Sequence, residues 1–113
     1  MNAPQAPMLA VITTTATTRD DARRIAHELV RRGLVACAQI NEIESVYAWK
    51  GAVAQETEWR LVLKTLAERY PAVEAAIREL HSYELPAIYA LPVTEASADY
   101  ADWVAEAVSR SGS

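Results

Sequence analysis

Glycine is scarce in this chain of 113 residues, which contains only Gly33, Gly51 and Gly112. A loop that cradles phosphates needs several glycines close together, so the sequence has no Gly-rich loop of the kind that holds a nucleotide. Each glycine has a structural explanation instead, because the usual use of glycine is access to positive φ. We expect a helix cap at Gly33, a hairpin turn at Gly51 and a tail at Gly112.

Cysteine is almost absent, since Cys37 is the only one and no disulfide can form within the chain. It lies in the apolar run 35–38, where an unpaired thiol usually behaves as a small, inert core side chain. Residues 1–7 have neither the basic nor the apolar block of a signal peptide. A lone thiol and no export signal together predict a cytoplasmic protein.

Runs of positive charge and long hydrophobic runs are also missing. The net charge is -4, and no five Lys or Arg residues follow one another. The resulting field repels phosphates and anionic lipids, so neither a nucleic acid nor a membrane surface is an expected partner. No stretch approaches the ~20 consecutive apolar residues that a membrane-spanning helix needs.

What the chain does have is an ordinary globular composition, with 51% hydrophobic and 23% charged residues. Its length fits one domain with one core. We expect a disordered leader over 1–7, a single folded domain over 8–109 and a polar tail over 110–113.

The hydrophobic pattern alternates between strand and helix periods. Apolar, β-branched runs predict four strands, and apolar residues at helical spacing predict two helices between them and a third at the end. Thr18 and Ser97 supply N-cap oxygens for the first and last helices. The predicted elements are a strand from 8 with threonines after 12, a helix over 18–32, strands over 34–49 and 53–66, a helix over 71–80, a strand over 87–93 and a helix from 97.

This order, βαββαβ plus a terminal helix, predicts the fold class. Right-handed crossovers place both main helices on one face of a four-stranded antiparallel sheet. The prediction is an α+β ferredoxin-like sandwich with a long hairpin between its second and third strands.

The long hairpin, which turns at Lys50-Gly51, predicts self-assembly. Both arms can exceed ten residues, twice the usual strand length, so a monomer leaves the tip uncovered. Trp49 and Trp59 are expected near that tip, and exposed aromatic residues beside unpaired strand edges usually mark an interface.

The segment 81–86 is the richest in chemical groups, because His81, Tyr83 and Glu84 fall within four residues. His81 has two interpretations, a site residue or a ring placed favourably at a helix C-terminus. No HxH, CxxC or HExxH spacing is present, so a metal site must be weak or built across subunits. His27 lies off the apolar stripe of its helix and is expected to face solvent.

Lys64 is the second unusual residue, because its ammonium follows an apolar strand segment. An exposed edge or a structural salt bridge explains it, since long cationic side chains reach solvent readily. The alternative is that Lys64 recognises an anion.

Four segments, 36–40, 45–51, 58–65 and 81–86, together resemble the CutA divalent-cation-tolerance family in their order and spacing. The likeness runs from about Leu9 to Trp103. It implies a ferredoxin-like subunit in a tight homotrimer, similar in arrangement to PII signalling proteins, whose recurrent polar residues gather in a cleft between subunits. The matching positions are Tyr47, Trp49, Glu58, Lys64 and Tyr83 as ligand-binding residues and His81 as a metal ligand.

The chain also departs from that family. Where members usually have His-Pro-Tyr it has Ser82 between His81 and Tyr83, and Ala87 replaces a glutamate after Pro86. Some members carry a cysteine near the end of the first strand that is implicated in copper binding, whereas this chain has threonines there. Copper as the bound divalent cation is correspondingly less supported.

Three functions are compatible with these residues. The leading hypothesis is a trimeric cytoplasmic protein of metal-ion homeostasis that binds a divalent cation such as copper, or a small anionic ligand, in the intersubunit cleft. The second is a PII-like signalling or scaffolding trimer that senses a metabolite and contacts a protein partner. The third, an enzyme with His81 or Glu58 as a general base, lacks any triad or cofactor motif, so the chain is expected not to be an enzyme.

Overall fold

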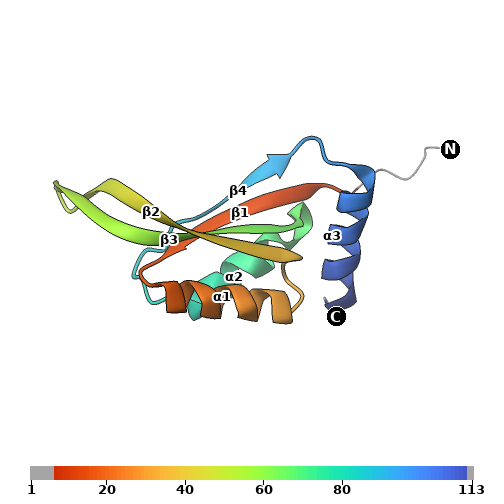
Figure 1. Ribbon diagram of the computed structural model, residues 1–113, viewed down its shortest axis with the longest axis horizontal. Coiled ribbons are helices and arrows are strands. Elements are labelled where there is room, and N and C mark those ends of the chain that lie inside the picture. Colours follow the sequence, from red (N-terminus) through yellow and green to blue (C-terminus); the bar gives the residue numbers. More distant parts are fainter. Residues whose placement is uncertain (1–6, 112–113) are drawn as a thin grey trace.

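A four-stranded antiparallel sheet with the strand order β2-β3-β1-β4 forms the centre of the molecule (Figure 1). The structure is a computed structural model that describes residues 7–111. Residues 1–6 of the predicted leader and 112–113 of the predicted tail lie outside the described residues. The elements are β1 (Leu9–Ala16), α1 (Arg19–Arg31), β2 (Cys37–Trp49), β3 (Ala52–Leu66), a 3-10 turn (Ala67–Arg69), α2 (Tyr70–Leu80), β4 (Ile88–Val93) and α3 (Ala98–Ser111).

Helices α1 and α2 cover one face of the sheet, which confirms the ferredoxin-like prediction. Alternate residues of β1 and β3 point into this layer, because successive side chains of a strand face opposite sides of the sheet. Ile12, Leu61 and Leu63 are completely buried there, together with Ile25 of α1 and Ile77 of α2. These residues form the main core.

Helix α1 begins and ends where the sequence predicts. The Thr18 hydroxyl accepts a hydrogen bond from the Asp21 amide at 3.1 Å, which satisfies one of the free N–H groups of the first turn. Gly33 follows the helix with a φ of 71°, a conformation that glycine adopts without steric cost. The exposed His27 lies on the outer side of this helix, as expected.

The hairpin of β2 and β3 is paired without interruption from Cys37 and Lys64 to Trp49 and Ala52. Lys50 and Gly51 both have positive φ, 49° and 80°, as in a type I′ turn whose twist matches that of the strands. The hairpin therefore projects from the body of the molecule and gives it a length of 57 Å against widths of 25 and 21 Å (Figure 1).

Helix α3 packs across one end of the other sheet face. Its buried residues Ala101, Val104 and Val108 meet Leu9 of β1 and Leu66 of β3 in a second, smaller core. The helix continues to Ser111, so its backbone extends two residues into the segment predicted as a tail. The rest of this face, which we call the open face, has no helix over it among the described residues.

Two side chains lie in other places than predicted. Cys37 is half-buried at the start of β2 rather than in the core, and its Sγ lies 3.9 Å from the Tyr100 hydroxyl of α3. Trp59 pairs with Ala16 and packs against the main core, with the Arg19 guanidinium 4.8 Å from its ring, so it is not at the hairpin tip.

No helix in the described part of the chain is long and apolar enough to cross a membrane.

Candidate functional site

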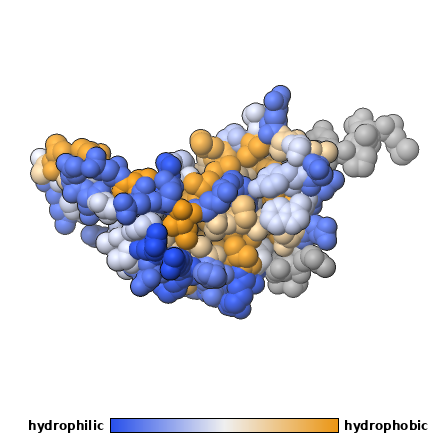
Figure 2. Space-filling view, in the orientation of Figure 1, coloured by the Kyte–Doolittle hydropathy of each residue, from blue (hydrophilic) through white to orange (hydrophobic). Residues whose placement is uncertain are grey.

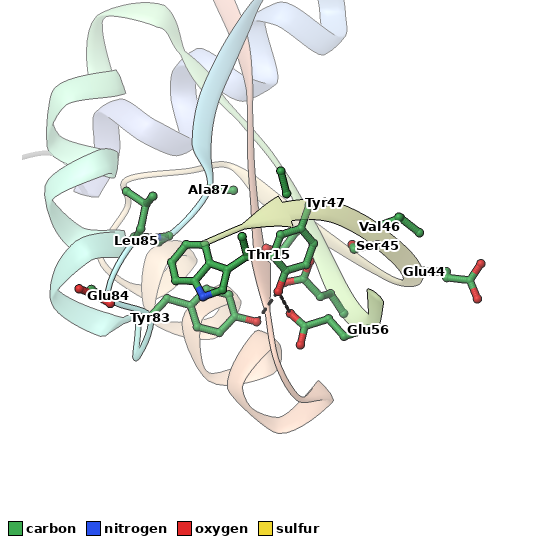
Figure 3. Close-up of a pocket in the computed structure, with 14 residues that line it drawn as sticks. Thr15, Glu44, Ser45, Val46, Tyr47, Glu56, Tyr83, Glu84, Leu85 and Ala87 are labelled. Carbon is green, nitrogen blue, oxygen red and sulfur yellow. Dashed lines mark hydrogen bonds between the residues drawn. The ribbon is translucent and has the colours of Figure 1, made fainter. Parts of the chain in front are cut away.

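A cavity of about 820 Å³ lies between the hairpin and the loop that joins α2 to β4 (Figure 3). Strands β2 and β3 of the hairpin form one wall of the cavity, and the loop forms the opposite wall. Thr15, near the end of β1, also lines the cavity. The lining residues are Thr15, Glu44, Ser45, Val46, Tyr47, Ala48, Trp49, Glu56, Glu58, Tyr83, Glu84, Leu85, Pro86 and Ala87.

Tyr83 joins the loop to the sheet. Its hydroxyl accepts a hydrogen bond from the Thr17 hydroxyl at 2.8 Å and donates one to Glu58 Oε2 at 2.9 Å. Burial raises the pKa of Tyr83 to about 12; the hydrogen bond from Thr17 opposes this shift, and the Glu58 carboxylate adds to it. The phenol therefore stays neutral and remains a donor at every physiological pH.

His81 holds Tyr83 in place. The Tyr83 amide donates to His81 Nδ1 at 3.0 Å, and the two ring centroids lie 4.4 Å apart. Because Nδ1 accepts a hydrogen bond, the proton of the neutral ring lies on Nε2, which donates to the Thr15 carbonyl oxygen. Both ring nitrogens are thus engaged with backbone groups in this chain.

Glu58 is the most buried charged residue at the cavity, with only 7% of its surface exposed. Its one hydrogen bond among the described side chains comes from the neutral Tyr83 hydroxyl, and none of the ion pairs between described residues includes it. A buried carboxylate without a cation is costly, so this position favours a positively charged neighbour.

Nearer the hairpin tip, Tyr47 donates a hydrogen bond from its hydroxyl to Glu56 Oε1 at 2.7 Å. This contact with Glu56 raises the pKa of Tyr47. Trp49 lies at the end of β2, is 41% exposed and has the Lys50 ammonium 5.5 Å from its ring. One cavity is therefore lined by four of the predicted ligand-binding residues, Tyr47, Trp49, Glu58 and Tyr83. His81 contacts this group by accepting a hydrogen bond from the Tyr83 amide.

Lys64 is not part of this group. It lies six residues along β3 from Glu58, which at the usual strand rise is about 20 Å. Its ammonium contacts the side-chain oxygen of Gln39 on β2. Lys64 is half-buried on β3, which is an internal strand rather than a sheet edge, and it forms no ion pair with another described residue.

The fit of a divalent cation can be judged from the available donors. The described part of the chain contains no group of three or more His, Cys, Asp or Glu side chains close enough to hold a metal ion. The nitrogens of His81 are engaged in hydrogen bonds. A closed metal site would therefore need donors from more than one chain.

Sequence reasoning missed Glu56 and Thr17, the partners of the two tyrosines. A signal for Glu56 was present, because a two-residue turn at Lys50-Gly51 fixes the register and makes Tyr47 and Glu56 diagonal neighbours across the hairpin. Thr17 had no such signal, since it lies 66 residues from Tyr83 and the contact depends on the path of an irregular loop.

Tyr83 should be the last of the five tyrosines to lose its proton when the folded protein is titrated with base. Its pKa is raised from 10 to about 12 in the folded chain, so the stability that it contributes is complete below pH 10 and is lost as the pH rises through 12. Phenolate absorbance measures the ionisation, and unfolding at each pH measures the stability.

The matched control is Tyr89→Phe, because Tyr89 is 51% exposed on β4 and has no hydrogen bond to another described side chain. Tyr83→Phe should remove the last step of the titration, whereas Tyr89→Phe should leave it in place. The assignment is wrong if the last step survives in Tyr83→Phe.

The fold and the cavity define a class of protein: a ferredoxin-like domain whose extended β2–β3 hairpin and α2–β4 loop enclose a binding cavity rich in tyrosine and glutamate. The family model described as CutA1 divalent ion tolerance protein matches residues 10–107. The chain belongs to this CutA family.

Curated relatives agree with the family model over nearly the whole chain. A probable divalent-cation tolerance protein cutA homolog from Encephalitozoon cuniculi is 38% identical over 101 residues, which cover 89% of each chain. The divalent-cation tolerance protein CutA of Thermus thermophilus is 36% identical over 100 residues, covering 88% of this chain and 97% of that protein.

Solved structures show the same fold. The periplasmic divalent cation tolerance protein CutA from Archaeoglobus fulgidus superposes with a TM-score of 0.87 at 33% identity, covering 88% of this chain and 98% of that one. The divalent ion tolerance protein CutA1 from Ehrlichia chaffeensis gives 0.86 at 31% identity, with 92% and 98% covered. The family predicted from four short segments is therefore confirmed.

Proposed function

We propose that this chain is a homotrimeric cytoplasmic protein of metal-ion homeostasis that binds a divalent cation, with copper as the first candidate, or a small ligand in a cleft between subunits. Membership of a family named for divalent-cation tolerance is the observation that carries the proposal. Such a protein acts by binding, and we propose no catalytic step for it.

The open face of the sheet supports assembly. Tyr89 and Leu91 of β4 lie on it with 51% and 58% of their surfaces exposed, beside the half-buried Val11 of β1. Contiguous exposed apolar side chains usually mark an interface. Figure 2 shows further apolar surface over the hairpin tip, where Val46 and Val53 are 63% and 80% exposed.

The cavity supports the binding role. Glu58 and Tyr83 present oxygen donors close to His81, and a neighbouring copy placed against the open face could add donors that one chain lacks. Lys64 would join such a cleft only through a second subunit, because it is distant from Glu58 within one chain. Its ammonium would then hold an anionic ligand.

The cytoplasmic location is the part of the proposal with the most direct test. The lone Cys37 supports it, whereas the related protein from Archaeoglobus fulgidus is described as periplasmic. Cell fractionation with a tagged full chain should place it in the cytoplasmic fraction, and recovery outside that fraction would refute this location.

We expect His81→Ala to weaken binding of copper or zinc at least tenfold, because the substitution removes the ring that positions Tyr83 at the cavity. Isothermal titration of the assembled protein measures the affinity. His27→Ala is the matched control, since His27 is the other histidine and faces solvent on α1. Equal affinities of the parent and His81→Ala would remove His81 from the metal site.

A PII-like signalling or scaffolding role is the alternative, and the size of the cavity favours it. About 820 Å³ lies within the usual range of pockets that hold small metabolites. A specific protein partner should then be recovered from native extract by the parent chain and lost with Val53→Glu at the hairpin tip. Recovery of the same proteins with both chains would count against this role.

A further inference from the structure

Glu58 and Lys64 carry opposite charges on one face of β3, and neither has an ionic partner among the described residues. Successive side chains of a strand alternate between the two faces of a sheet, so positions six apart share a face. Lys64 pairs with Val11 of β1, which belongs to the open face, so Glu58 is directed to the same side. Both charges therefore lie on the side of the sheet that the proposed assembly would cover.

Neither charge is favourable in a single chain. Glu58 is only 7% exposed and Lys64 is half-buried, so water solvates both incompletely. A charge that is removed from water without an opposite charge beside it is costly. The other charged side chains on this face of β3, Glu56 and Arg60, are both exposed. The two poorly solvated charges of this strand face are thus of opposite sign.

Glu58 and Lys64 cannot meet within one chain. Six residues of strand separate them by about 20 Å, which is farther than the two side chains can reach. β1 ends at Ala16 opposite Trp59, so Glu58 is the first residue of β3 with no partner on β1, at the root of the projecting hairpin (Figure 1). Lys64 lies inside the body, where β3 has a paired strand on either side. A contact between these positions needs the hairpin of one copy against the body of another.

Both groups keep hydrogen-bonding capacity for such a contact. The Glu58 carboxylate accepts a hydrogen bond from the Tyr83 hydroxyl through Oε2, whereas an ionised carboxylate has about four acceptor positions. The Lys64 ammonium has three N–H donors and contacts the side-chain oxygen of Gln39. Each group can therefore bond to the other while it keeps its present partner, and one donor of Lys64 remains for an anionic ligand.

We propose that Glu58 of one copy forms an ion pair with Lys64 of the next copy, with the root of the first hairpin against the body of the second. Each copy carries the two groups at different places, so the contact is head-to-tail and a closed ring uses each group once. The pair completes the candidate site, because it supplies a cation beside Glu58 and its partner Tyr83. This inference rests on the proposed function in taking the assembly to be a homotrimer, which would hold three such pairs.

A double-mutant cycle on the full chain tests the pair. Glu58→Gln and Lys64→Met remove the charges with little change in side-chain size. Analytical ultracentrifugation over a dilution series, at one urea concentration that partly dissociates the parent, measures association. Each single variant should weaken association at least tenfold, because it leaves a buried charge without a partner. The double variant should weaken it less than either single variant, because no unpaired charge remains.

Lys50→Met is the matched control, since Lys50 is the only other lysine and is exposed at the hairpin turn. Its effect on association should multiply with that of Glu58→Gln, as the effects of independent positions do. Circular dichroism checks that every variant is folded. The double variant separates a lost ion pair from a folding defect, because a second substitution would not relieve such a defect.

Three outcomes overturn the inference: a parent that is monomeric without urea, a single variant that associates as tightly as the parent, or effects of Glu58→Gln and Lys64→Met that simply multiply. Copper or zinc binding by a trimer in which the two effects multiply would refute the pair and leave the proposed function in place. A coupled pair in a trimer that binds no metal or small ligand would retain the pair and refute the proposed binding role.

Discussion

Leu61→Ala is expected to lower the free energy of unfolding by about 2–5 kcal/mol, the usual cost of removing a buried leucine side chain. Leu61 is completely buried on β3, in the core cluster that includes Ile12 of β1 and Ile25 of α1. It also lies three residues from Glu58 on the same strand, so the core that it fills fixes the strand that carries the cavity. Denaturant unfolding at a fixed protein concentration measures the change.

Leu85→Ala is the matched control, because it removes the same atoms from a side chain that is 68% exposed in the loop before β4. We expect it to change the free energy of unfolding by less than about 0.5 kcal/mol, as exposed substitutions usually do. A loss of stability in Leu85→Ala as large as that in Leu61→Ala would contradict the position of the core.

The burial of Leu61 could be predicted from sequence because it follows from a local rule. Leu61, Leu63 and Thr65 alternate with the half-buried Val62 and Lys64, and a strand of period two must place the first three on one face. The hairpin turn was equally local, since Lys50-Gly51 supplies the positive φ values that a two-residue turn requires. Fold and register therefore follow from patterns a few residues long.

The candidate site was only partly predictable, because its contacts join residues far apart in the chain. The family resemblance named Tyr83 and His81, but their bonds to Thr17 and Thr15 span 66 residues and depend on an irregular loop. The family resemblance alone grouped Lys64 with these residues. Within one chain Lys64 lies six residues along β3 from Glu58, which is about 20 Å at the usual strand rise.

Cys37 and Trp59 show how burial departs from local expectation. Cys37 has an apolar sequence context, yet β2 is an edge strand and the thiol lies on the open face beneath Tyr100. Trp59 has polar neighbours, yet β3 places it opposite Ala16, whose small side chain leaves room for the indole ring against the core. Strand order, which depends on the whole chain, decides both cases.

If the subunits assemble through the open face, Leu91→Glu should convert the trimer into monomers. Three copies of a 12.4 kDa chain give a particle of about 37 kDa, and light scattering after size exclusion distinguishes it from the single chain. Leu91 is 58% exposed in one chain and pairs with Val11, so the variant can fold while its interface changes. Circular dichroism checks the fold.

Leu91→Glu should dissociate the trimer because it would bury an unpaired carboxylate in the subunit interface, which costs several kcal/mol for each ion. Each 1.4 kcal/mol of this cost weakens association about tenfold. Ala75→Glu adds the same charge on an exposed position of α2, behind the opposite sheet face, and should leave the trimer intact. A Leu91→Glu protein that still runs as a trimer would place the subunit contacts away from the open face, leaving the hairpin and the outer strand edges to hold the copies together. Dissociation of Leu91→Glu alone would instead assign the exposed side chains of β4 to the interior of the assembly.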